Sequence, residues 1–218
     1  MAEKKLRILA LHGGYQNGTI FRTRRIRDLQ NKLKSIAEFV CIDGPILATP
    51  GKEPIDERRN WFSWDQNDPE LFEEYVHQDA IIWWQFEETC KYLDELWESM
   101  GPFDGVLGFS QGAEAASVWI DDRLRKGQYP SQPKFLIAIS AFLRPKPLNF
   151  PDYATSPLTT PSLHVVGLKD QYIPPARSIE LAEMYEDKLI YEHPGEHVVP
   201  QKPADCQVFK DFLGRFLN

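Results

Sequence analysis

The stretch F-D-G-V-L-G-F-S-Q-G, residues 103–112, decides the fold of this chain. Its part Phe103 to Phe109 is short and mostly apolar, which is typical of a buried parallel strand. The alanine-rich run from Ala113 to Ile120 is typical of a helix. Between the two, residues 108–112 form G-x-S-x-G, a pattern that arises by chance in some chains but here has a strand before it and a helix after it. The sequence therefore predicts a nucleophile elbow, in which flanking glycines permit a sharp turn that exposes the hydroxyl of Ser110.

On both sides of this stretch, apolar runs of strand length alternate with runs of helical spacing. The predicted strands are 6–11, 37–42, 103–109, 134–140, 162–167 and 188–192, and the predicted helices are 21–36, 78–100, 113–120, 176–185 and 204–216. Such alternation predicts an α/β fold with a mostly parallel sheet of about six strands and helices on both faces. We expect a single α/β-hydrolase domain over residues 1–218, with lid-like insertions at about 43–77 and 141–160.

Composition excludes several classes of protein. The 218 residues carry a formal net charge of −7, which disfavours nucleic acid, and no apolar run approaches the roughly 20 residues of a membrane span. Cys41, Cys90 and Cys206 are scattered, so neither a disulfide framework nor a metal site is indicated, and we expect a cytoplasmic protein. No G-x-G-x-x-G follows a strand, so no redox cofactor is expected. A protein without stable membrane insertion and without a cofactor is predicted.

A serine hydroxyl needs a base, and the base needs an acid to orient it. In α/β-hydrolases the chain order is serine, acid, histidine, with each residue in a loop after a strand. His12 and His77 precede Ser110 and His164 sits inside an apolar strand, so these three are poor candidates for the base. His197 follows Pro194-Gly195 in the loop before the last helix and is favoured over His193, which ends the last strand.

The acid is expected between the serine and the histidine, directly after a strand. Asp170 fits this position, whereas Asp152 in a long loop and Asp187 at the start of a strand are expected to be solvated. An oxyanion hole needs two backbone N–H groups. Gln111 supplies one, and the glycine-rich loop after the first strand supplies the other, from Gly14 or, as an alternative, from Tyr15.

Four segments together resemble the FSH-type family of small eukaryotic serine hydrolases, which includes the ovarian-cancer-associated hydrolase. These segments span nearly the whole chain: 11–21 with L-H-G and Q-N-G, 101–113 with G-P-F-D-G and the elbow, 161–174 with P-S-L-H and Asp170, and 193–200 with H-P-G-E-H and V-P. The resemblance implies esterase or thioesterase activity on acyl substrates and the same three catalytic residues. Glu196 departs from the small or uncharged residue expected beside His197, and a carboxylate there would alter the basicity of that histidine.

Aromatic residues are concentrated in the two predicted insertions, at the edge of the sheet where α/β folds bind ligands. Trp61, Phe62, Trp64, Phe142 and Tyr153 are expected to wall an apolar cleft for a medium-length acyl chain, although aromatic residues in such loops can also simply pack them down.

A cluster of arginines, Arg22, Arg24, Arg25 and Arg27, lies early in the first predicted helix. Most such clusters are solvated helix faces. With a functional role, this one would attract a phosphate-bearing substrate such as a coenzyme A or acyl-carrier thioester.

Two functions from different classes therefore remain. The first is a serine hydrolase that cleaves carboxylic esters or thioesters through an acyl-enzyme. The second is a ligand-binding or sensing module that keeps the fold with slow or vestigial catalysis, since fold alone does not specify function. The glycine-lined loop and the complete set Ser110, Asp170 and His197 favour the hydrolase.

Overall fold

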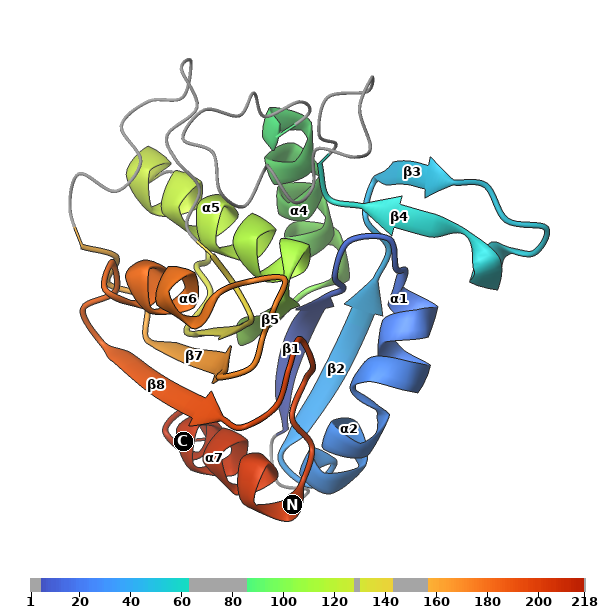
Figure 1. Cartoon of the computed structure of the whole chain (residues 1–218). Helices are drawn as coiled ribbons and strands as arrows, with labels where there is room; N and C mark the ends of the chain where they lie inside the picture. The colour runs from blue at the N-terminus through green and yellow to red at the C-terminus, as the bar shows by residue number, and fades with distance from the viewer. Residues whose placement is uncertain (1–4, 63–85, 128–129, 143–156, 218) are drawn as a thin grey trace.

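The computed structural model describes residues 5–62, 86–127, 130–142 and 157–217 of the chain. Its centre is a six-stranded sheet in the order β2-β1-β5-β6-β7-β8, in which every neighbouring pair is parallel (Figure 1). The strands are β1 (Leu6–Leu11), β2 (Ala37–Ile42), β5 (Gly105–Phe109), β6 (Leu136–Ile139), β7 (Ser162–Gly167) and β8 (Lys188–His193). The predicted α/β fold is confirmed.

Helices cover both faces of this sheet (Figure 1). One face is covered by α4 (Phe86–Met100), α5 (Gln111–Lys126) and α6 (Pro175–Ala182). The other is covered by α1 (Gly18–Ile20), the π-helix η1 (Phe21–Arg25), α2 (Arg27–Leu33) and α7 (Pro203–Gly214). Among the helices that the structure describes, none combines the length and the apolarity needed to cross a membrane.

Strand β1 shows how one sheet supplies two cores. Successive side chains of a strand point to opposite faces. Leu9 and Leu11 accordingly belong to the core under α4 and α5, whereas Ile8 and Ala10 belong to the core under α2 and α7. A strand buried on both faces reads as a continuous apolar run, which is why the central strands β1, β5, β6 and β7 could be predicted from the sequence.

Within the first predicted insertion the structure contains a small antiparallel hairpin instead of an irregular loop. Its strands are β3 (Ile46–Thr49) and β4 (Arg58–Asn60), joined through the 3-10 turn η2 (Pro54–Asp56). The strands are short and half exposed, so they lack the apolar signal of the main sheet. The rest of the predicted insertions, residues 63–77 and 143–156, and residues 78–85 of the predicted helix lie outside the described residues.

The first predicted helix, 21–36, is interrupted. The N–H of Ile26 donates to the carbonyl of Phe21 at 3.0 Å, an i to i+5 hydrogen bond that widens one turn into the π-helix η1. Phe21 and Ile26 are both buried although they are five residues apart, a spacing that a regular α-helix would place on different faces. The π turn lets both side chains reach the same core.

Candidate active site

Ser110 lies between β5 and α5, at the C-terminal end of a central strand. Its backbone has φ 53° and ψ −124°, a conformation that a non-glycine residue adopts only under strain. Gly108 and Gly112 make this turn possible, because a Cβ at Gly108 would overlap the backbone of Ala113 and one at Gly112 would overlap the carbonyl of His12. The strained serine between two closely packed glycines matches the predicted elbow.

Asp170 and His197 meet through a short hydrogen bond of 2.7 Å between Asp170 Oδ2 and His197 Nδ1. Asp170 follows β7, and His197 lies in the loop between β8 and α7. The other carboxylate oxygen, Oδ1, accepts the backbone N–H groups of Tyr172 (3.0 Å) and Ile173 (2.9 Å). The acid is thus held by its own loop and is also bonded to the histidine.

The ionisation of Asp170 reflects two opposing effects. Burial alone would raise the pKa of its carboxyl, but the hydrogen bonds from His197 and Ile173 outweigh burial, so the pKa lies below its ordinary value. Asp170 is therefore an anion at neutral pH, and it favours the tautomer of His197 that carries the proton on Nδ1. That tautomer leaves Nε2 as an acceptor, as a general base requires.

A cavity of about 300 Å³ brings together half of the predicted site residues, including Ser110 and His197. It is lined by Gly13, Gly14, Tyr15, Gln16, Ser110, Gln111, Phe142, Tyr172 and His197. Among the described residues no hydrogen bond joins the Ser110 hydroxyl to His197, although both side chains line this cavity. Catalytic hydrogen bonds are often loose in unliganded sites and tighten around the substrate.

Of the two candidate donors in the loop after β1, Gly14 and Tyr15, the N–H of Tyr15 is already bonded. The N–H of Tyr15 donates to the side-chain oxygen Oδ1 of Asn60 at 2.8 Å. The N–H of Gly14 has no hydrogen-bond acceptor within the described part of the chain. Gln111 begins α5, so its N–H precedes the intrahelical hydrogen bonds. These two N–H groups belong to residues that line the cavity with Ser110.

Three other described histidines, His12, His164 and His193, are buried. Burial lowers the pKa of His12 to about 4 and of His164 to about 3. His193, the alternative candidate for the base, is buried at the end of β8, and burial lowers its pKa. Its Nδ1 accepts the N–H of Gly195 at 3.2 Å. None of the three lines the cavity within the part of the chain the structure describes.

The predicted aromatic wall is only partly present. Phe142 lines the cavity, but Trp61 and Phe62 do not; both are fully buried in the core shared by α4 and α5. The sequence does not separate these two placements, because an aromatic side chain after a strand has the same sequence signal in a wall and in a core. Trp64 and Tyr153 lie outside the described residues.

The sequence did not reveal the contribution of Tyr172 and Gln16. The Tyr172 ring lies 5.3 Å from the His197 ring, and the Phe109 ring lies 4.8 Å from it. Gln16 lines the cavity beside the glycine-rich loop. No motif marks these residues, since an exposed tyrosine two positions after an aspartate has no distinctive spacing. The four clustered arginines are exposed, and none of them lines the cavity.

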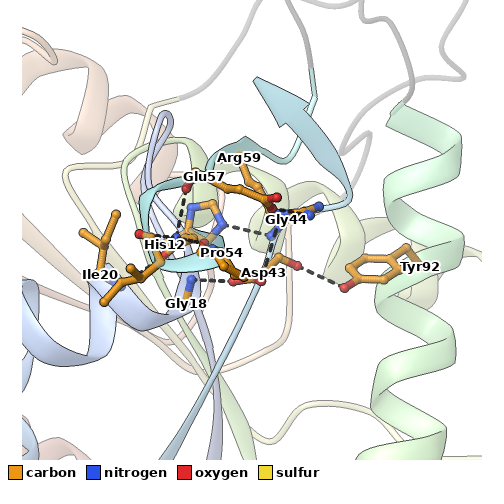
Figure 2. A network of polar contacts seen from close by, with 11 residues as sticks. His12, Gly18, Ile20, Asp43, Gly44, Pro54, Glu57, Arg59 and Tyr92 are labelled. Atoms are coloured by element: carbon orange, nitrogen blue, oxygen red, sulfur yellow. Dashed lines mark hydrogen bonds and ion pairs between the residues drawn. The ribbon is translucent and has the colours of Figure 1, made fainter. Parts of the chain in front are cut away.

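A polar network fastens the glycine-rich loop to the chain after β2 (Figure 2). His12 Nε2 accepts the N–H of Gly44 at 2.9 Å, and His12 Nδ1 lies 2.7 Å from the carbonyl of Gly13. Asp43 accepts the N–H of Gly18 at 2.8 Å, and the hydroxyl of Tyr92 donates to the carbonyl of Asp43 at 3.0 Å. The loop that lines the cavity is thereby held at both ends.

A family model described as serine hydrolase (FSH1) matches residues 1–208 of the chain. The chain is 31% identical over 229 residues to human esterase OVCA2, a match that covers 99% of this chain and 98% of the human protein. It is 32% identical over 220 residues to a Schizosaccharomyces pombe protein named dihydrofolate reductase. That match covers 96% of this chain but 47% of the yeast protein, so the chain spans about half the length of this relative.

Solved structures share the fold at lower sequence identity. The structure of YahD with malic acid has a TM-score of 0.66 and 14% identity, and the match covers 99% of this chain and 96% of that chain. At this identity the likeness concerns the fold alone.

Proposed function

Because this chain belongs to the FSH1 family of serine hydrolases, we propose that it hydrolyses carboxylic esters through an acyl-enzyme formed on Ser110. His197 takes the hydroxyl proton as the Ser110 oxygen attacks the acyl carbon, and it then gives that proton to the departing alcohol. A water molecule then gives a proton to His197 and attacks the acyl carbon. The bond between that carbon and the Ser110 oxygen breaks, the acid leaves, and His197 returns the proton to the serine oxygen. The observation that carries this proposal is the 2.7 Å contact between His197 and Asp170 at a cavity that Ser110 also lines.

The two oxyanion donors in this proposal are the N–H groups of Gly14 and Gln111. Negative charge develops on the acyl oxygen in the transition state, and preorganised donors there typically lower the barrier by about 3 to 4 kcal/mol each. The occupied N–H of Tyr15 supports Gly14 over Tyr15 as the donor of the first loop.

For the substrate we propose a medium-length acyl group, carried as an ester or a thioester. The cavity volume of about 300 Å³ stands at the small end of ligand pockets, which suits an acyl chain rather than a bulky ligand. Phe142 and Tyr172 supply apolar surface, and each buried methylene contributes about 0.8 kcal/mol. A coenzyme A or acyl-carrier thioester remains compatible with the exposed arginines.

Steady-state hydrolysis of p-nitrophenyl esters tests the proposal. Ser110→Ala should lower turnover by roughly 10⁴-fold or more. Ser35→Ala, which changes an exposed serine far from Ser110 in the sequence, should keep wild-type rates. Across an ester series from acetyl to palmitoyl, the kcat/KM of the wild type should peak at medium length. A wild type that binds acyl esters without turning them over would instead favour a ligand-sensing module.

A further inference from the structure

Three consecutive residues, Asn60, Trp61 and Phe62, contact both chain segments that supply the proposed oxyanion donors. We call these residues the clamp. Asn60 ends β4, and all three are buried. They are not among the residues that line the cavity in the described part of the chain, so they cannot act there by touching substrate. Any effect of the clamp on the reaction has to pass through the groups it holds.

On one side the clamp holds the loop after β1. Asn60 Oδ1 accepts the N–H of Tyr15 at 2.8 Å, and the indole Nε1 of Trp61 donates to the carbonyl of His12 at 2.7 Å. Tyr15 has φ 55°, a left-handed conformation that a non-glycine residue keeps only where its surroundings enforce it. The Asn60 carboxamide supplies part of that enforcement. Gly14, which lies between the two held residues, is fixed as a consequence.

On the other side the clamp holds Gln111, whose backbone N–H is the second proposed donor. The side-chain oxygen Oε1 of Gln111 accepts the N–H of Trp61 at 2.9 Å, and its Nε2 donates to the carbonyl of Phe62 at 2.9 Å. Gln111 is buried. A buried carboxamide that uses both its donor and its acceptor has one orientation available, because turning it would break both bonds. The side chain of Gln111 thus ties the start of α5 to the clamp.

Gly14 sits where these two carboxamides converge. A Cβ built at Gly14 would lie 3.5 Å from Asn60 Oδ1 and 3.6 Å from Gln111 Oε1. The first donor residue is therefore within van der Waals reach of both side chains that bind the clamp. Gly14 and Gln111 are therefore both held against the clamp, although the two residues are far apart in the sequence.

We propose that the clamp sets the spacing between the N–H groups of Gly14 and Gln111, and that Asn60 and the Gln111 side chain are positioning residues of the oxyanion hole. This inference rests on the proposed function. The hole acts on charge that exists only in the transition state, so a loosened clamp lowers kcat and leaves KM nearly unchanged. A residue that only stabilised the fold would lower the melting temperature without this kinetic signature.

The test uses Asn60→Ala, which removes the acceptor of Tyr15, and Gln111→Met, which keeps the side-chain length and removes both bonds. A misplacement of about 1 Å can cost about 100-fold in rate, so kcat on a p-nitrophenyl ester should fall about 10- to 100-fold in each variant, with KM within about twofold. The Ki of an alkyl trifluoromethyl ketone, which forms a tetrahedral adduct on the serine, should rise by the same factor. The double variant should lose less than the product of the two single losses.

Arg58→Ala is the matched control, because Arg58 lies in the same strand as Asn60 but its side chain donates to the carbonyl of Asp56 within the hairpin, at 2.8 Å. It should keep wild-type kcat and Ki. Each variant is assayed below its own melting temperature, and if Asn60→Ala does not fold, Gln111→Met decides alone. Unchanged kcat in a folded variant, or a loss of kcat without a rise in Ki, would overturn the proposed role of the clamp. Ser110→Ala in the same assay separates the two proposals, since full activity there would refute the proposed function itself.

Discussion

Asp170 divides its two oxygens between two tasks. Oδ1 binds the backbone of its own loop, and Oδ2 binds His197. The backbone of its own loop therefore fixes the Asp170 carboxylate independently of His197. The fixed carboxylate in turn orients the histidine. A low pKa keeps the charge on Asp170, so in the proposed mechanism this carboxylate stabilises the imidazolium that forms when His197 takes the proton of Ser110.

The choice between two histidines gives the first prediction at the scale of residues. His197→Ala should lose turnover as severely as the serine variant, because the base and the nucleophile act as one unit. His193→Asn should keep most of its turnover, because an asparagine oxygen can still accept the N–H of Gly195. Both variants are compared by kcat on the same p-nitrophenyl ester. The reverse ranking would show that the base has been assigned to the wrong side of this loop.

The second prediction at this scale concerns His164 and acid stability. Burial, with a smaller effect of Lys188, lowers the pKa of His164 to about 3 in the folded state, whereas an unfolded chain has a histidine pKa near 6.5. Below about pH 6.5 the unfolded state therefore binds more protons, and stability falls as the pH falls toward 3. From pH 7 to pH 5 this one histidine should cost about 2 kcal/mol of unfolding free energy.

His164→Gln removes that titration. Urea denaturation at pH 7 and pH 5 should show a loss of stability about 2 kcal/mol smaller in the variant than in the wild type, whatever the variant's stability at pH 7. Equal losses in the two proteins would mean that His164 is not buried in its neutral form. The comparison isolates His164 because His12, whose pKa is also lowered, is present in both.

Among the elements, the hairpin β3–β4 is held in part by a single side chain of the loop before α1. Asn17 Nδ2 donates to the carbonyls of Ile55 (3.0 Å) and Glu57 (2.9 Å), with a longer contact to Pro54 (3.4 Å). Its Oδ1 accepts the N–H of Ile20 at 2.7 Å and so caps α1. One carboxamide thus fastens the turn of the hairpin to the start of a helix, in the region shown in Figure 2.

Replacing Asn17 separates these two roles. Asn17→Asp keeps the cap acceptor but removes the donors to the hairpin, so amide hydrogen exchange should become faster across residues 46–60 while α1 stays protected. Asn17→Ala should show the same faster exchange and lose about 1 kcal/mol more of stability with the cap. Hydrogen exchange read by mass spectrometry measures the first effect. Unchanged exchange in the hairpin of Asn17→Asp would contradict its anchoring role.

The central strands β1, β5, β6 and β7 could be predicted because they are buried on both faces. The boundaries of β1, β2 and β7 agree with the apolar runs of the sequence. The hairpin β3–β4 could not be predicted, since Asn17, Gln16 and Asn60 hold it through contacts that are distant in sequence. The π turn at Phe21–Arg25 could not be predicted either, because near-helical spacing of apolar residues does not reveal one extra residue in a turn.

At the scale of the whole molecule, strained backbone conformations are concentrated at one edge of the sheet. The described non-glycine residues with positive φ are Tyr15, Ser110 and Ser140, and they follow β1, β5 and β6. These strands are parallel neighbours, so their C-terminal ends lie together. Asp170 and His197 follow β7 and β8 on the same edge. Strained backbone persists where surrounding structure enforces it, and here it lies at the edge where α/β folds bind ligands.

The candidate site could be anticipated from the sequence only where chain order constrains it. Ser110, Asp170 and His197 each follow a strand in the order that the fold demands, so placement alone was enough to propose them. The walls of the cavity follow no such rule. Trp61 and Phe62 are buried in the core. The carboxamides of Asn60 and Gln111 form hydrogen bonds with residues that are distant in sequence, so their contacts could not be predicted.

The central claim is that Ser110 is the nucleophile of this serine hydrolase, and active-site labelling tests it most directly. A fluorophosphonate probe reacts with a serine only when a base and an oxyanion hole activate it. Mass spectrometry of the labelled wild type should place one adduct on Ser110, while Ser110→Ala should stay unlabelled and the exposed-site control Ser35→Ala should be labelled normally. An unlabelled wild type, or an adduct on another residue, would contradict the account.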